Sequence, residues 1–110
     1  MSIHFYIRGF MEQQNLSDGH RGRLREKFME TGSRSLTKSN LIELLLFYSV
    51  KRADTKPVAS RIVNHYGGSF ERLFCAPAAE LEKIEGVGAN SAELIALAGK
   101  ILRAINKCGE

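Results

Sequence analysis

Two glycines that flank a valine, Gly86-Val87-Gly88, are the residues of this sequence whose types and spacing could do chemistry. Glycine has no β-carbon, so it accepts a backbone path with positive φ and leaves its peptide N–H group open to a ligand. A helical pattern starts at Ala89, and the start of a helix presents unpaired N–H groups and a positive dipole end. Together these groups predict a site for one or two nucleic-acid backbone phosphates, contacted without base specificity.

The residues on either side of this turn fit a helix-hairpin-helix pattern over residues 81–97. Apolar Leu81 and Ile84 precede the turn. We expect Val87 to fill the gap between the two helices and Ala92 to let them approach closely. The alternative interpretation is that the turn is a tight helix–helix connection that binds no ligand.

Acidic residues surround the glycine turn in the sequence. Glu82 and Glu85 precede it, Glu93 follows it, and no lysine or arginine stands where a positive charge is expected beside a bound phosphate. Repulsion from these carboxylates opposes phosphate binding. At physiological ionic strength, salt largely screens this repulsion only at distances beyond about 8 Å. The local sequence therefore supports the helix-hairpin-helix geometry more strongly than it supports phosphate binding by the turn.

Positive charge is concentrated in the first two thirds of the chain. The formal net charge is +4 and the pI is near 9.3, and residues 1–68 carry a balance of +5 whereas residues 69–110 carry −1. A basic surface suits an anionic partner such as nucleic acid. Any electrostatic contact with such a partner should therefore involve the first two thirds.

The densest basic patch runs over residues 20–27. Helical spacing puts Arg21 and Arg25 on one face, and we expect their charges to be exposed while Leu24 and Phe28 face the core. A solvated helix face is the alternative to a phosphate-contacting patch. The predicted nucleic-acid-binding residues are Gly86, Val87, Gly88, Arg21, Arg25, Lys51, Arg52 and Lys56.

Lys51 and Arg52 lie in the connection between two further predicted helices, residues 41–48 and 55–66, and Lys56 lies at the start of the second of these helices. This pair could be a degenerate copy of the hairpin that lacks the glycines. In a pseudo-two-fold pair of hairpins, the basic copy would supply the charge that the glycine-bearing copy lacks.

The elements that must position these residues are all helices. Apolar spacing predicts helices near residues 19–31, 41–50, 55–66 and 89–106, with two short ones between them. The fold class is therefore all-α, a compact bundle of about five to six short helices. We expect one domain at residues 16–107, preceded by an arm at residues 1–15.

Residue types at the helix ends support these boundaries. Helix starts are predicted at Ser17 or Asp18, at Thr37 or Ser39, and at Asp54 or Thr55. The predicted stops and short-helix starts are Gly32, Gly67-Gly68, Ser69 and Pro77, and Pro57 falls in a first helical turn, where its missing N–H group costs nothing.

No catalytic, metal or cofactor pattern is found. Cys75 and Cys108 are 33 residues apart with no Cys-x-x-Cys pair and no nearby histidine, and the three histidines lack ligand spacing. We expect surface or capping histidines, reduced thiols, a cytoplasmic location, no membrane partner and no enzyme activity. No apolar run approaches the roughly 18 residues that a membrane helix needs.

Four stretches carry a resemblance to a known family: residues 19–28, 41–59, 66–74 and 80–97. Together they resemble the N-terminal helical domain of the RadC family. The resemblance implies a link to DNA repair. In that family this domain precedes a zinc metallohydrolase-like domain of the JAMM type, so we expect this chain to be an excised N-terminal domain or a shortened relative.

Two hypotheses follow for the function. The first is a non-catalytic module that binds DNA weakly and without sequence specificity through backbone phosphates. The second is a protein-interaction or structural module that docks on a JAMM-type metallohydrolase domain absent from this chain, or on another protein. The acidic last third favours the second hypothesis.

Overall fold

The computed structural model describes residues 16–51 and 54–108, and these residues form helices and no strand. There are six helices in these ranges, which confirms the predicted all-α fold class. The chain divides into two compact units, Met1–Lys56 and Pro57–Glu110. The predicted arm at residues 1–15 lies outside the described residues, and the domain boundaries stay a prediction.

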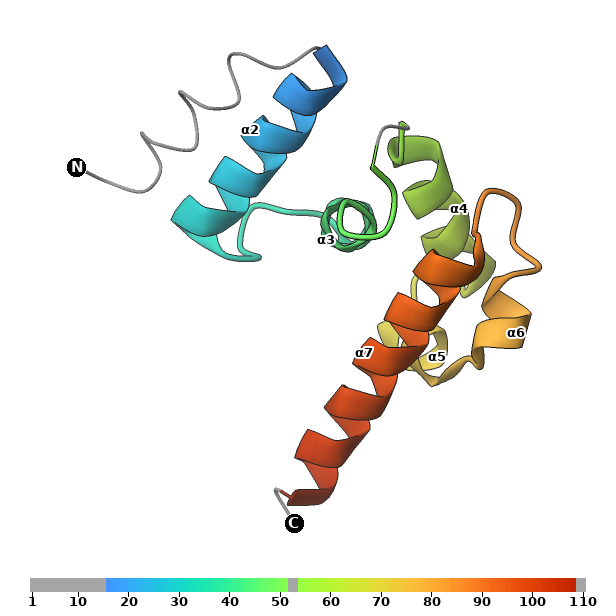
Figure 1. The fold of residues 1–110 in the computed structure, drawn as a ribbon. Coiled ribbons are helices and arrows are strands. Elements are labelled where there is room, and N and C mark those ends of the chain that lie inside the picture. The colour runs from blue at the N-terminus through green and yellow to red at the C-terminus, as the bar shows by residue number, and fades with distance from the viewer. Residues whose placement is uncertain (1–15, 52–53, 109–110) are drawn as a thin grey trace. The chain divides into compact units, whose positions relative to one another are not determined.

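The first unit contains two helices that pack against each other, α2 (Leu16–Thr31) and α3 (Lys38–Leu46) (Figure 1). Helix α2 ends as predicted at Gly32, whose φ of 63° suits glycine and whose N–H group donates to the Phe28 carbonyl at 2.7 Å. The predicted N-caps, Ser17 and Asp18, are wrong because both residues lie inside the helix.

Helix α3 begins with the N-cap that the sequence predicts. The Thr37 side chain accepts from the Asn40 N–H group at 3.0 Å, and the Asn40 side chain accepts from the Thr37 N–H group at 3.1 Å. This reciprocal pair is a capping box. The buried side chains of the first unit include Leu24, Ile42 and Leu46.

The second unit contains most of α4 (Lys56–His65), followed by α5 (Phe70–Cys75), α6 (Ala78–Leu81) and α7 (Ala89–Cys108). Pro57 lies in the first turn of α4, and Gly67 and Gly68 after its end have φ of 62° and 80°. Ser69 caps α5 by accepting from the Arg72 N–H group at 3.1 Å. These predicted helix ends are confirmed.

Helices α5 and α6 both pack against α7, and one glycine makes the closest approach possible. A β-carbon added at Gly99 would lie 1.8 Å from the carbonyl oxygen of Phe74. The same carbonyl accepts from Nη1 of Arg103 at 2.8 Å. The buried side chains of these three helices include Leu73, Leu81 and Ile95.

The C-terminal end of α7 extends past α5 and α6 (Figure 1). From Leu97 onward the large apolar side chains of α7 include four that are exposed, and they are Leu97, Ile101, Leu102 and Ile105. None of the helices in the described ranges is both long and apolar enough to cross a membrane.

Candidate nucleic-acid interface

The glycine turn connects the short helix α6 to the long helix α7. Gly86 has a φ of 92°, the side chain of Val87 is buried, and α7 begins at Ala89. Ala92 is fully buried in the first turns of α7, as expected for a residue that allows close helix packing. The predicted helix-hairpin-helix element is therefore present in the second unit.

The two glycines of the turn are not equivalent. A β-carbon at Gly86 would lie 2.8 Å from Cγ2 of Val58 and 3.0 Å from Nη1 of Arg61. At Gly88 a β-carbon would meet nothing within 4 Å, and φ is not positive. The expectation that both glycines take positive φ is therefore right for Gly86 and wrong for Gly88. Gly88 leaves open space where a ligand can approach the backbone.

The N–H groups of the turn differ in their availability. The Val87 N–H group donates to the Ile84 carbonyl at 3.0 Å, so it is already engaged. The Gly88 carbonyl accepts from the Ala92 N–H group at 3.0 Å, which starts the hydrogen bonds of α7. The donors that the geometry offers to an anion are therefore those of Gly88 and of the exposed first residues of α7, Ala89 and Asn90.

A positive charge lies beside the turn, supplied by Arg61 of α4. Its Nη1 donates to the Glu85 carbonyl at 2.7 Å, and the residue is exposed. The local sequence around the glycines gave no sign of this residue because Arg61 stands 24 positions before Glu85. Only the packing of α4 against the turn brings it there.

The predicted acidic surroundings are also present. Glu82, Glu85 and Glu93 are all exposed, so water and salt screen their charges. The electrostatic field at the turn therefore combines Arg61, the exposed Lys83 and a helix N-terminus with three screened carboxylates.

Arg21, in the first unit, is buried rather than exposed. It is 6% exposed, its Nη1 donates to the Val50 carbonyl at 2.6 Å, and its guanidinium stacks on the Phe47 ring at 4.7 Å. The expectation of an exposed charge is wrong here because an arginine can bury its apolar stem and planar head against an aromatic ring. Arg21 fixes the end of α3 and is poorly placed to contact a phosphate.

Arg25 lies partly exposed beside the same ring. Its guanidinium is 5.5 Å from the centroid of Phe47 and 5.6 Å from that of Tyr48. Its Nε is buried and has no hydrogen-bond partner among the described residues. The prediction that Phe28 of the same helix faces the core is wrong, because that side chain is 42% exposed.

Two of the three basic residues, Lys51 and Arg52, precede α4, and Lys56 is its first residue. Lys51 and Lys56 are exposed, and the Lys56 N–H group donates to Oδ1 of Asp54 at 3.2 Å. Arg52 lies outside the described residues. The eight predicted residues fall into two groups. Those of the glycine turn belong to the second unit, and the basic ones belong to the first. The predicted second hairpin spans both units and stays a prediction.

One polar pair in the first unit was not expected from the sequence. Nε2 of His20 lies 2.9 Å from Oε2 of Glu43, whose residue is almost fully buried. A buried carboxylate needs a polar partner. His20 is therefore part of the α2–α3 contact and not an ordinary surface histidine, although helix periodicity alone gives no sign of which residue pairs with Glu43.

The fold and the turn define a small all-helical domain with a helix-hairpin-helix element. The model of the UPF0758 N-terminal domain family matches residues 20–93. The chain belongs to this family, and the match confirms the resemblance to the RadC-type N-terminal domain.

Two relatives illustrate the similarity. A UPF0758 protein of Fusobacterium nucleatum is 37% identical over 91 residues, which cover 83% of this chain and 39% of the relative. A UPF0758 protein of Ruegeria pomeroyi is 44% identical over 69 residues, which cover 63% of this chain and 30% of the relative. The matched region is well under half of either relative's length, and no solved structure matches the chain.

Proposed function

We propose that this chain is a non-catalytic module that binds DNA weakly through backbone phosphates, without base specificity, at the glycine turn between α6 and α7. A role in DNA repair, which the RadC resemblance implies, and a cytoplasmic location belong to the same proposal.

The observation that carries the proposal is the position of Arg61. Its guanidinium lies at the turn, where it donates to the Glu85 carbonyl, and the N–H groups of Gly88 and of the α7 N-terminus lie in the same turn. A helix N-terminus binds anions through its N–H groups and its dipole, and a nearby arginine adds a charge-assisted donor. The open space at Gly88 lets a phosphate approach the backbone.

The affinity should be low and strongly dependent on salt. Glu82, Glu85 and Glu93 repel a phosphate, and the attraction comes from few cations. Lys51, Arg52 and Lys56 are the additional residues that we expect to contribute at long range. Nonspecific DNA binding is dominated by counterion release, so each lost phosphate contact lowers the salt dependence.

Charge reversal at Arg61 tests the proposal. Fluorescence anisotropy of labelled duplex and single-stranded DNA at about 50 and 200 mM salt measures the affinity and its salt slope. We expect Arg61→Glu to weaken binding to all sequences and to reduce the salt slope by about 1. Lys100→Glu, at an exposed position on α7, makes the same change in charge and is the control.

Equal losses for Arg61→Glu and Lys100→Glu would mean that net charge alone drives binding, and the turn would not be the site. Thermal unfolding of both variants shows whether each remains folded. No binding by the unmodified chain, even at low salt, would reject the proposal.

A second candidate function is a protein-interaction module, and the apolar surface of α7 favours it. Four large apolar side chains between positions 97 and 105 are about half exposed, at 53%, 52%, 48% and 60% for Leu97, Ile101, Leu102 and Ile105. Contiguous exposed apolar surface is typical of binding sites. Under this proposal the face docks on a JAMM-type metallohydrolase domain or on another protein, and DNA affinity is absent.

A further inference from the structure

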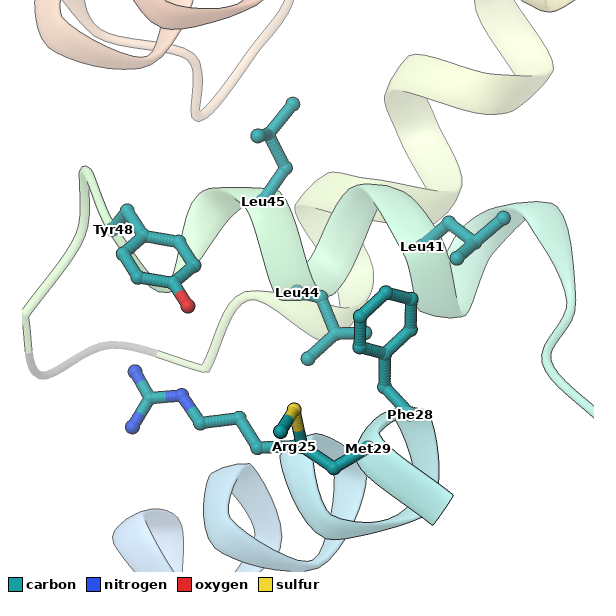
Figure 2. A pocket seen from close by; sticks show the side chains of 7 residues that line it. All are labelled: Arg25, Phe28, Met29, Leu41, Leu44, Leu45 and Tyr48. Atoms are coloured by element: carbon teal, nitrogen blue, oxygen red, sulfur yellow. The ribbon is translucent and has the colours of Figure 1, made fainter. Parts of the chain in front are cut away.

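A groove between α2 and α3 lies in the first unit, and the proposed phosphate site uses none of its lining residues. It encloses about 400 Å³. Figure 2 shows Arg25 and Met29 extending from α2 toward α3, with Leu44 and Tyr48 on the opposite side. The described residues that line this α2–α3 groove are Arg25, Phe28, Met29, Leu41, Leu44, Leu45 and Tyr48.

The groove is apolar and open to solvent at its edges. Phe28 is 42% exposed, Met29 is 48% exposed and Tyr48 is 76% exposed. Large apolar side chains that gather at one concave site are costly to leave in water, and tyrosine, methionine, phenylalanine and arginine are enriched in the cores of protein interfaces. The lining of this groove has the composition of a recognition site.

The dimensions of the groove suit a short helix. Leu41 to Tyr48 covers about two turns of helical rise, on the order of 10 Å. Two packed helices with apolar side chains along their junction form the kind of groove that holds the apolar face of a third helix. Such a ligand presents side chains at positions i, i+3 or i+4, and i+7.

Arg25 gives the groove a charge that the described lining residues do not neutralise. None of these residues carries a carboxylate. The almost fully buried carboxylate of Glu43 in α3 pairs with His20 instead. The rings of Phe47 and Tyr48 hold the guanidinium of Arg25, and its Nε has no hydrogen-bond partner among the described residues.

We propose that the α2–α3 groove binds an amphipathic helix of a partner protein, which fills the groove with apolar side chains and places an aspartate or glutamate against Arg25. Arg25 is partly exposed, so the partner's carboxylate would approach its guanidinium from the solvent side and form charge-assisted hydrogen bonds there. This interaction is independent of the phosphate site and of the α7 face.

A second copy of the chain could offer the exposed face of α7 to the groove. The charges on that face do not complement Arg25. Residues 94–108 contain no aspartate or glutamate, whereas Lys100 and Arg103 lie among the exposed apolar residues. A second copy would therefore bring positive charges toward Arg25. Charge complementarity favours a partner of different sequence.

The test is a selection followed by matched binding measurements. A displayed library of short helix-forming peptides, randomised on one face, is selected on the full chain. We expect enriched peptides to carry apolar residues at i, i+3 or i+4, and i+7 together with one carboxylate. Their affinities for variants of the chain are then measured by fluorescence anisotropy.

Two pairs of variants locate the peptide. Met29→Glu should weaken binding at least about tenfold, whereas Leu102→Glu, at a residue with the same 48% exposure on α7, should leave it unchanged. Arg25→Gln should weaken binding of the carboxylate-bearing peptides, and Arg23→Gln on the same helix should not. Changing the peptide carboxylate to its amide should cancel the effect of Arg25→Gln.

Three results would overturn the proposal. The first is a selection that enriches no peptide, or only peptides that bind Met29→Glu as well as the unmodified chain. The second is a dimer, seen by analytical ultracentrifugation, that Met29→Glu disrupts, because a second copy would then be the occupant. The third is a rise in peptide affinity on changing Phe5 and Phe10 to serine, because the chain's own leading segment would then compete for the groove.

Discussion

Arg61 and Arg21 carry the same charge in different surroundings, and this decides what each can do. Arg61 is exposed and lies at the glycine turn, where one nitrogen donates to Glu85 and the rest of the guanidinium can reach an anion. Arg21 is stacked on Phe47 and donates to Val50 from a buried position. At the scale of single residues, Arg61 is therefore a binding candidate and Arg21 a packing residue.

Tyr66 is a buried residue whose hydroxyl oxygen has no hydrogen-bond partner among the described residues. Burial raises the pKa of Tyr66 above its ordinary value of 10.0, and the negative charge of Glu80 adds to this, while Arg72 lowers it. The unfolded chain therefore releases this proton more readily than the folded chain. As pH rises above about 10, the free energy of unfolding should fall.

We expect Tyr66→Phe to keep or raise the free energy of unfolding at pH 7, by up to about 1 kcal/mol, because an unpaired buried hydroxyl is removed. Between pH 9 and 11 the free energy of unfolding of the variant should also fall less than that of the unmodified chain. The difference is the part of the pH dependence that comes from the raised pKa of Tyr66. Urea unfolding across this range measures both effects. Tyr48→Phe, at an exposed tyrosine, should follow the unmodified chain, and a Tyr66→Phe variant with an unchanged alkaline profile would contradict the account.

At the scale of elements, the packing of α5 on α7 depends on Gly99. An alanine there would place its β-carbon 1.8 Å from the Phe74 carbonyl oxygen, and that atom is backbone, so the helices must separate. We expect Gly99→Ala to lower the free energy of unfolding by about 3 kcal/mol or more, since overpacking against a rigid neighbour is costly. Thermal or urea unfolding measures the loss, and a variant as stable as the unmodified chain would show that α5 and α7 do not approach here.

Helix ends were predictable where a local residue determines them. Thr37 with Asn40, Ser69, Pro57 and the Gly67-Gly68 pair each act within a few positions of the boundary they make. The start of α2 was not predicted, because two good capping residues occur inside the helix and Leu16 precedes them.

The candidate site was predictable only in part. The glycine turn is a local pattern, so its position and the burial of Val87 and Ala92 followed from the sequence. Arg61 could not be found this way, because its position at the turn depends on how α4 packs. The pairing of His20 with Glu43 was missed for the same reason, since the two residues are 23 positions apart.

At the scale of the whole molecule, each unit carries its own candidate surface. The phosphate site belongs to the second unit and the α2–α3 groove to the first. A module with two independent surfaces can hold DNA at one and a protein partner at the other. The proposals therefore predict that Gly88→Ala leaves peptide binding at the groove unchanged.

Whether phosphates approach the backbone at the glycine turn can be tested by measuring DNA affinity and stability for Gly88→Ala. Space and backbone conformation permit an alanine at this position, so the free energy of unfolding should stay the same or rise by up to about 1 kcal/mol. If phosphates approach the backbone at Gly88, the added methyl group should weaken DNA binding by about tenfold, or about 1.4 kcal/mol. A Gly88→Ala variant that remains folded and binds DNA as tightly as the unmodified chain would contradict phosphate binding at this turn.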